Sequence, residues 1–258
     1  MLASWMHELR LALRRVRRAK GFYAAAVLTL AIGMAGATVM FTLIRGILLR
    51  PLPVPAEDRL VVSWRVAPEG PTHVPYRSAD VEEIGRTSRL FAGVTGVGYN
   101  GAWDQVWADA GNAFTARTAV VMGSFFAVTG ATPVRGRAFT ADDDREGAER
   151  VVVLSHAAWR RVFAGAPGVI GRRLTLGTHA FVVVGVMPPD FEYPPSIEVW
   201  IPRWALASTE QNSEFRTGLV RDVEIVARLR PGITLTQASA ELARMAAALD
   251  ARVAEGFV

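Results

Sequence analysis

The sequence contains no cysteine, so neither a disulfide framework nor a thiolate-ligated metal site is available to it. Histidine is scarce as well. His7, His73, His156 and His179 lie far apart, and none has a partner three or four positions away with which to bind zinc. A Gly-x-x-x-x-Gly-Lys-Ser/Thr phosphate loop is also missing, which excludes an ATPase site in this chain. We therefore expect no metal and no cofactor.

Three glycines match the G-x-G-x-x-G spacing of dinucleotide-binding loops: Gly96, Gly98 and Gly101. That motif holds a pyrophosphate only where a helix begins directly after it. Residues 102–107 instead alternate like a strand. We interpret these glycines as breaks between short strands.

An acidic stretch imitates the start of a calcium loop, with Asp142, Asp144, Glu146 and Gly147 at suitable positions. The twelfth position is Val153, where such a loop needs a bidentate glutamate. We interpret the stretch as a solvated acidic loop. No motif in the chain supplies a catalytic centre, so we expect no enzyme.

Positive charge is concentrated at the N-terminus, although the whole chain carries +5. Residues 1–50 have a balance of +7, so the remaining 208 residues sum to −2. A nucleic-acid-binding domain would carry its basic excess on the folded surface. Here the excess flanks an apolar segment, which indicates membrane topology and no nucleic-acid partner.

The apolar segment comprises the 24 uncharged residues between Lys20 and Arg45. As a helix at about 1.5 Å per residue it spans about 36 Å, enough to cross the roughly 30 Å core of a lipid bilayer. We predict one transmembrane helix over residues 21–46, in the inner (plasma) membrane. By the positive-inside rule, basic residues before it indicate a cytoplasmic N-terminus and a periplasmic or extracytoplasmic main domain. These topology residues are Arg14, Arg15, Arg17, Arg18 and Lys20.

Two alternatives for this segment stay open. A buried core helix of this length without a polar face is uncommon. A cleaved signal peptide is suggested by the small residues at 35–37, but signal h-regions run only about 7–15 residues, and the apolar run continues to Ile44. An uncleaved anchor fits best. Within it, Gly33 and Ala37 have the small-xxx-small spacing of a helix–helix contact, which predicts a homodimer through this helix.

Residues 1–20 have an amphipathic pattern. Apolar side chains fall on one helical face and arginines mostly on the other, which predicts a cytoplasmic helix lying in the membrane interface. An irregular basic tail is the alternative. The apolar face comprises Leu2, Trp5, Met6, Leu9, Ala12, Leu13 and Val16.

Residues 51–258 are predicted to form an α+β domain. Prolines at 51–55 make a stiff exit from the membrane. A short β-rich run follows at 59–66, and Ser78 can cap a helix whose first turn is acidic. The glycine-punctuated residues 90–121 predict several short strands.

The middle of the domain contains a predicted buried strand at 151–154. Ser155 then caps a helix that ends near Gly165, and it lacks the Gly-x-Ser-x-Gly setting of a catalytic serine. Residues 172–176 and 180–187 predict a hairpin.

The C-terminal unit is a strand followed by a helix. Apolar residues alternate with charged ones at 223–230, and Pro231-Gly232 turns the chain. Thr234 and Gln237 make a capping box. The helix that follows has an apolar stripe: Leu235, Ala238, Leu242, Met245 and Leu249. Strand–helix units at both ends of the domain suggest an α+β fold with an inserted middle part.

Five segments in order resemble the permease subunits of MacB/FtsX-type ABC transporters, and specifically their MacB-like periplasmic core domain. The N-terminal block is most similar to the duplicated orphan permeases of that group. The segments are ELRLALRRVRRAKGFYAAAVLTLAIGMAGATVMFTLIRGILLRPLP, VMGSFFAVTGATPVRGRAFTADDD, VVVLSHAAWRRVFAGAPGVIGRRLTLGTHAFVVVGVMPPDFEYP, IEVWIP and VARLRPGITLTQASAEL.

The resemblance implies a two-part periplasmic α+β domain over residues 51–258, with a porter-like part interrupted by an inserted subdomain at about 145–205. It also implies an ABC ATPase subunit as partner, and movement of the membrane helix driven by ATP. Permeases of this class carry further membrane helices after the domain, and no second apolar span precedes Val258. We therefore expect a truncated or partial permease, whose further spans are supplied by a missing C-terminal part.

Two other hypotheses remain. In the first, the chain is a single-span, membrane-anchored interaction module that regulates an envelope protein without transport. In the second, it is an anchored enzyme whose site the sequence does not reveal.

Overall fold

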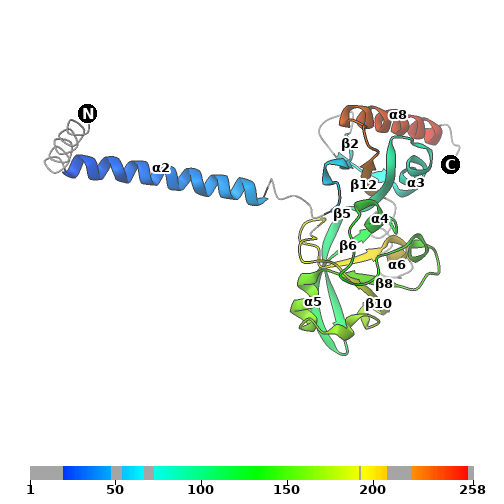
Figure 1. Ribbon diagram of the computed structural model, residues 1–258. Coiled ribbons are helices and arrows are strands. Elements are labelled where there is room, and N and C mark those ends of the chain that lie inside the picture. The colour runs from blue at the N-terminus through cyan, green and yellow to red at the C-terminus, as the bar shows by residue number, and fades with distance from the viewer. Residues whose placement is uncertain (1–19, 48–53, 67–72, 192, 208–221, 255–258) are drawn as a thin grey trace. The chain divides into compact units, whose positions relative to one another are not determined.

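The computed structural model describes residues 20–47, 54–66, 73–191, 193–207 and 222–254 (Figure 1). The chain divides into two compact units, Met1–Pro51 and Leu52–Val258. The predicted interfacial helix over 1–20 lies outside the described residues except for Lys20.

The first unit contains the helix α2 (Lys20–Ile47), which confirms the prediction of a continuous helix here. Its apolar side chains are exposed along its length: Phe22, Val27, Leu28, Leu30, Ile32, Met34, Val39, Met40 and Phe41. Among the described residues, no helix meets the combined requirement of length and apolar character for crossing a membrane. That α2 is a transmembrane helix stays a prediction.

The second unit is built on a mixed sheet of ten strands. The order of its main path is β1 (Leu60–Ser63), β12 (Asp222–Leu229), β5 (Phe91–Asp109), β6 (Asn112–Val121), β11 (Val199–Pro202), β8 (Val151–Leu154), β10 (His179–Val186) and β7 (Arg135–Gly136). In addition, β4 (Tyr76–Arg77) pairs with β12, and β9 (Arg173–Leu176) pairs with β10 and β5. A separate two-stranded sheet joins β2 (Arg65–Val66) and β3 (His73–Val74).

Helices of 5 to 20 residues pack on this sheet. They are α3 (Ser78–Thr87), α4 (Phe125–Thr129), α5 (His156–Phe163), α6 (Arg203–Ala207) and α8 (Leu235–Ala254), with 3-10 turns η1 (Glu57–Arg59), η2 (Ala141–Asp144) and η3 (Pro167–Val169). Figure 1 shows α3 and α8 at one end of the domain and α5 at the other. The prediction of an α+β domain is confirmed.

Residues 90–121 form two long strands, so the prediction of several short strands is wrong. The glycines lie within β5, where they permit close packing. A Cβ added to Gly96 would lie 2.8 Å from Cγ2 of Val223 on β12. The pairing of β5 with β6 shifts register between Val97 and Ala102, which is where glycine in a strand has a structural use.

The start of α3 also differs from the prediction. Arg77 is the N-cap, in extended conformation, and Ser78 is the first helical residue. The guanidinium of Arg77 donates to both carboxylate oxygens of Asp80, at 2.9 and 2.8 Å. This ion pair lies at the start of the helix, where the N-cap residue makes no side-chain capping bond.

Two other caps are confirmed. Ser155 Oγ accepts the N–H of Ala158 at 3.0 Å at the start of α5. The N–H of Thr234 donates to Gln237 Oε1 at 2.9 Å before α8, and the N–H of Gln237 donates back to Thr234 Oγ1 at 3.3 Å. The apolar stripe of α8 is buried except at Leu235, which is 63% exposed.

The buried side chains form three clusters. One lies between α3, α8 and β12, one beneath α5 on β8 and β10, and one around α4 at the middle of the sheet. The predicted hairpin of β9 and β10 and the strands β8 and β12 are confirmed. Of the strands within 145–205, β11 pairs with β6 and β9 pairs with β5 in the same sheet. The boundary of an inserted subdomain therefore stays a prediction.

Candidate functional site

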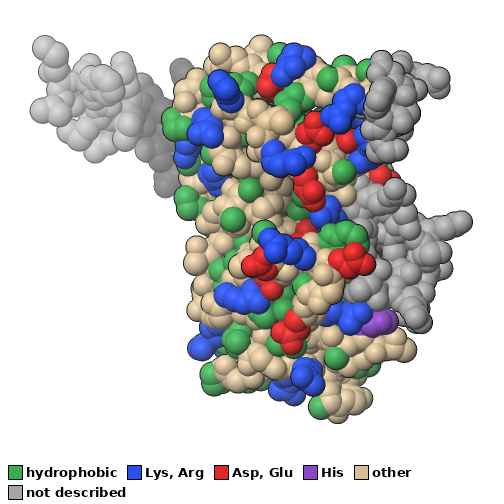
Figure 2. Space-filling model, turned by 90° about the vertical axis from the view of Figure 1, so that its right-hand side faces the viewer, with side chains coloured by type: hydrophobic (Ala, Val, Ile, Leu, Met, Phe, Trp, Pro, Cys, Tyr) green, Lys and Arg blue, Asp and Glu red, His purple; other side chains and the backbone are tan. Residues whose placement is uncertain are grey.

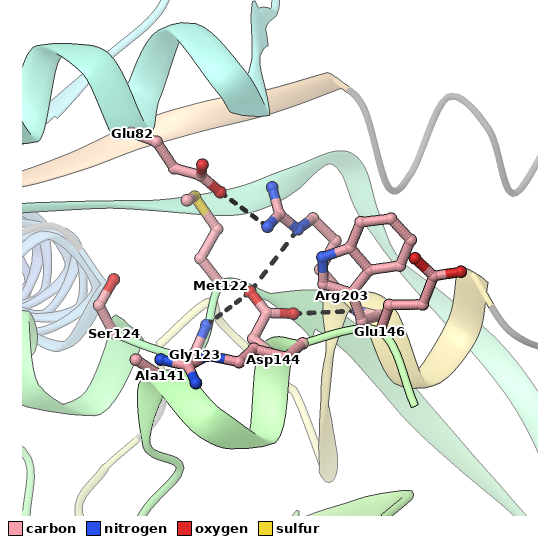
Figure 3. Close-up of a pocket in the computed structure, with 10 residues that line it drawn as sticks. Glu82, Met122, Gly123, Ser124, Ala141, Asp144, Glu146 and Arg203 are labelled. Atoms are coloured by element: carbon pink, nitrogen blue, oxygen red, sulfur yellow. Dashed lines mark hydrogen bonds and ion pairs between the residues drawn. The ribbon is translucent and has the colours of Figure 1, made fainter. Parts of the chain in front are cut away.

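A pocket of about 430 Å³ opens where α3, η2 and α6 meet (Figure 3). Charged side chains from all three elements face it. The lining residues are Glu82, Met122, Gly123, Ser124, Ala141, Asp144, Arg145, Glu146, Arg203 and Trp204.

Arg203 is the central cation of this pocket, and it is buried, with 8% of its surface exposed. Its Nη2 donates to Glu82 Oε1 at 2.8 Å. Its Nε lies 3.6 Å from Asp144 Oδ2 and donates no hydrogen bond within the described part of the chain. One guanidinium therefore connects α6 with α3 and with η2.

Asp144 fixes two further backbone segments. Its Oδ2 accepts the N–H of Gly123 at 3.0 Å, and its Oδ1 accepts the N–H of Trp204 at 2.9 Å. A Cβ at position 123 would lie 2.6 Å from the carbonyl oxygen of Thr140, so this approach requires glycine. Burial raises the pKa of Asp144, although the charge of Arg203 and the two N–H donors oppose that rise.

The neighbouring Asp143 has the opposite pKa shift. Burial raises its pKa, but the hydrogen bonds from Arg137 and Thr140 outweigh burial, so the pKa lies below its usual value. Arg137 donates to both carboxylate oxygens at 2.6 and 2.9 Å. Thr140 and Asp143 form a capping box at the start of η2. These bonds hold η2 in position beside the pocket.

A second concave region, which we call the α4 groove, has a volume of about 330 Å³. It follows α4 and includes the left-handed residue Gly130, at φ +70°. The lining residues are Phe126, Ala127, Gly130, Ala131, Thr132, Pro133, Gly136, Arg137, Ala138 and Phe139. Its wall is mostly apolar, and Thr132 and Arg137 are among the polar residues that line it.

The acidic loop was predicted to be solvated, and this is wrong for Asp144, which is 8% exposed. Asp142 and Glu146 are exposed, as expected. Gly96 and Gly98 lie inside β5, where no helix N-terminus follows them. In the described residues, no three His, Asp or Glu side chains are grouped so that they could hold a metal ion.

The residues predicted to act at the membrane all belong to the first unit. Arg14, Arg15, Arg17 and Arg18 fall outside the described residues, and Lys20 begins α2. Gly33 and Ala37 are exposed on α2, and nothing lies within 4 Å of a Cβ added to Gly33. Their roles in topology and in helix contact stay predictions.

Sequence reasoning missed Glu82, Arg203 and Arg228. Glu82 and Arg203 are 121 positions apart, and no local pattern connects them. The sequence pattern predicted that Arg228 lies on the polar face of a half-buried strand. In the structure its guanidinium donates hydrogen bonds to backbone carbonyls. On the face of the domain that Figure 2 shows, basic and acidic side chains are interspersed and form no continuous basic surface.

A comparison with protein families shows to which family the chain belongs. A sequence model of the MacB-like periplasmic core domain matches residues 23–245. The chain belongs to the MacB-like periplasmic core domain family. This confirms the resemblance to MacB/FtsX-type permeases, whose periplasmic parts have this domain.

Two solved structures share the fold. The periplasmic region of MacB from Actinobacillus actinomycetemcomitans is 19% identical, has a TM-score of 0.58, and is matched over 80% of this chain and 86% of that one. A domain of a permease protein from Porphyromonas gingivalis is 16% identical, with a TM-score of 0.52 and coverage of 74% and 84%. Comparison with curated protein sequences finds no match. The pocket and the α4 groove therefore both lie within a MacB-like fold.

Proposed function

We propose that this chain is a permease component of a MacB/FtsX-type ABC transporter. Its domain couples ATP-driven movement of the membrane helix to export or to a partner protein. The observation that carries the proposal is the extent of the family match, which begins at residue 23, inside α2, and runs through the domain to residue 245. The helix and the domain thus belong to one family unit.

The proposal includes α2 as a membrane anchor with a cytoplasmic N-terminus. Its run of 24 uncharged residues between Lys20 and Arg45 and its exposed apolar side chains suit a lipid environment. The hydroxyls of Thr29 and Thr38 donate to the carbonyls of Ala25 and Met34 at 3.0 and 2.7 Å. A hydroxyl that is hydrogen-bonded within the helix avoids the free-energy cost that an unpaired hydroxyl has in lipid.

An ABC ATPase subunit is the partner that this function requires, because the chain has no phosphate loop of its own. Pairing of two copies through Gly33 and Ala37 would give a symmetric arrangement of two domains. The pocket and the α4 groove supply no nucleophile–base pair within the described residues. They fit a domain that binds or moves better than one that performs chemistry.

Co-purification tests the proposal. The chain is tagged at its chromosomal locus, expressed at its native level, cross-linked in intact cells and purified from the membrane fraction. We expect an ABC ATPase to co-purify, and its yield to fall when the apolar helix is interrupted by Ala31→Asp. A chain that is recovered from the membrane without any ATPase would contradict the proposal and favour a membrane-anchored interaction module.

A further inference from the structure

Arg228 on β12 joins residues 54–56, which we call the linker, to the interior of the domain. In the described part of the chain its hydrogen bonds go to four backbone carbonyls and to no carboxylate. Burial lowers the pKa of Arg228, and the nearby charge of Arg59 acts in the same direction. An arginine in this setting holds backbone segments together and forms no ion pair.

One side of the guanidinium holds the linker into the domain. Nη1 donates to the carbonyls of Pro55 and Ala56 at 2.6 and 3.1 Å. The residue before them, Val54, is buried in the cluster around α4. Residues 54–56 are therefore docked both by an apolar side chain and by two charged hydrogen bonds.

The other side of the guanidinium holds the end of α4. Nε donates to the carbonyl of Val128 at 2.8 Å, and Nη2 donates to that of Thr129 at 2.7 Å. Carbonyls at a helix C-terminus lack intrahelical partners and carry partial negative charge, so a cation is favoured there. Arg228 thus connects the linker directly to α4.

The contact continues to the α4 groove. A Cβ added to Gly130 would lie 3.3 Å from Pro55 Cδ and 3.3 Å from Arg228 Nη2, so all three residues lie against one another. Gly130 is also a lining residue of the α4 groove, together with Phe126 and Phe139. A displacement of residues 54–56 would therefore reach the groove through a few adjacent contacts.

We propose that Arg228 is a positioning residue that transmits displacement of the linker, residues 54–56, to α4 and the α4 groove. The hydrogen bonds from Arg228 to the linker and to α4, which we call the clamp, lie within the domain. Only the source of the displacement, movement of α2, rests on the proposed function.

Force spectroscopy on the full-length chain in detergent micelles tests the clamp. Because the chain has no cysteine, Leu52→Cys and Ala254→Cys give two unique attachment points. In the parent chain we expect the linker to stay docked until the domain unfolds. In Arg228→Met we expect an earlier extension of about 20 Å at lower force, the length of residues 52–57 when extended from the attachment point. The later unfolding force of the remaining domain should be unchanged.

Two further variants complete the test. Arg244→Met removes an exposed arginine of α8 and should leave the traces as in the parent chain. Arg228→Lys keeps the charge with fewer donors, and it should give an intermediate detachment force; it also replaces Arg228→Met if that variant does not fold. Identical traces for the parent chain and the Arg228 variants would overturn the proposal. No ATPase is needed, so this result is independent of the co-purification experiment.

Discussion

Arg203 of α6 and Glu82 of α3 form an ion pair at 2.8 Å that connects two elements 121 positions apart in the chain. The two side chains differ in exposure, since that of Arg203 is 9% exposed and that of Glu82 is 51% exposed. Arg203 also faces the buried carboxylate of Asp144. Loss of Arg203 would therefore leave the buried carboxylate of Asp144 with its two backbone N–H donors but without the cation that faces it.

We predict that Arg203→Met destabilises the domain by about 3–5 kcal/mol, because it removes the cation that faces the buried carboxylate of Asp144. Glu82→Gln is the matched control and should cost about 0–1 kcal/mol, as expected for a half-exposed partner. Urea denaturation of both variants in detergent, followed by tryptophan fluorescence, measures the difference. Equal effects of the two substitutions would contradict this account.

We predict that ionisation of Asp144 lowers the stability of the folded domain. Its pKa is raised in the folded state, so the folded protein binds a proton more tightly than the unfolded chain does. Stability from this group is present at low pH and is lost as pH rises from the ordinary carboxyl pKa through the raised one. Urea midpoints measured from roughly pH 3.5 to 7 should show this loss in the parent chain, and Asp144→Asn should lack it.

Asp143 should behave in the opposite way, because Arg137 and Thr140 lower its pKa in the folded state. Its contribution to stability is present above the ordinary carboxyl pKa and is lost as pH falls through the lowered value. In the same series of midpoints, Asp143→Asn should therefore remove part of the acid-side loss of stability. If both asparagine variants changed the pH profile in the same direction, the opposed shifts of these adjacent aspartates would be wrong.

Local signals in the sequence predicted much of the fold. Ser155 and Thr234 were placed correctly as caps, because a cap depends on residues within one turn of it. The prediction for Ser78 was wrong because the helix begins at Ser78 itself, with Arg77 at the N-cap position and no side-chain capping bond there. The glycines of β5 were interpreted as breaks because their use, close packing against β12, depends on a strand more than a hundred residues away.

The candidate site could not be predicted in this way. Asp144 lies in a stretch with the composition of a solvated loop, and Gly123 and α6 approach it from other parts of the chain. Arg228 occupies a polar position in an alternating strand, and its carbonyl partners at Pro55 and Val128 come from distant segments. Both residues are defined by tertiary contacts, which hydrophobic periodicity does not encode.

Membrane topology can be tested with single cysteines in the cysteine-free chain. We expect Ala247→Cys, at an exposed position of α8, to react with a membrane-impermeant maleimide added to spheroplasts. Ala3→Cys should react only after the membrane is permeabilised, because the basic residues before α2 favour a cytoplasmic N-terminus. Labelling of Ala3→Cys in intact spheroplasts would contradict the predicted orientation.

Association through α2 is predicted to depend on the small residues Gly33 and Ala37. Gly33→Leu combined with Ala37→Leu fills the face through which a second helix would approach, and we expect dimerisation in lipid to weaken about tenfold, equivalent to about 1.4 kcal/mol. Ala35→Leu is the matched control, because position 35 lies about 200° around the helix from position 33. Energy transfer between labelled copies in liposomes measures the association. Equal weakening by the control and by the double substitution would show that this face makes no specific contact, and the homodimer would then have to form elsewhere in the chain.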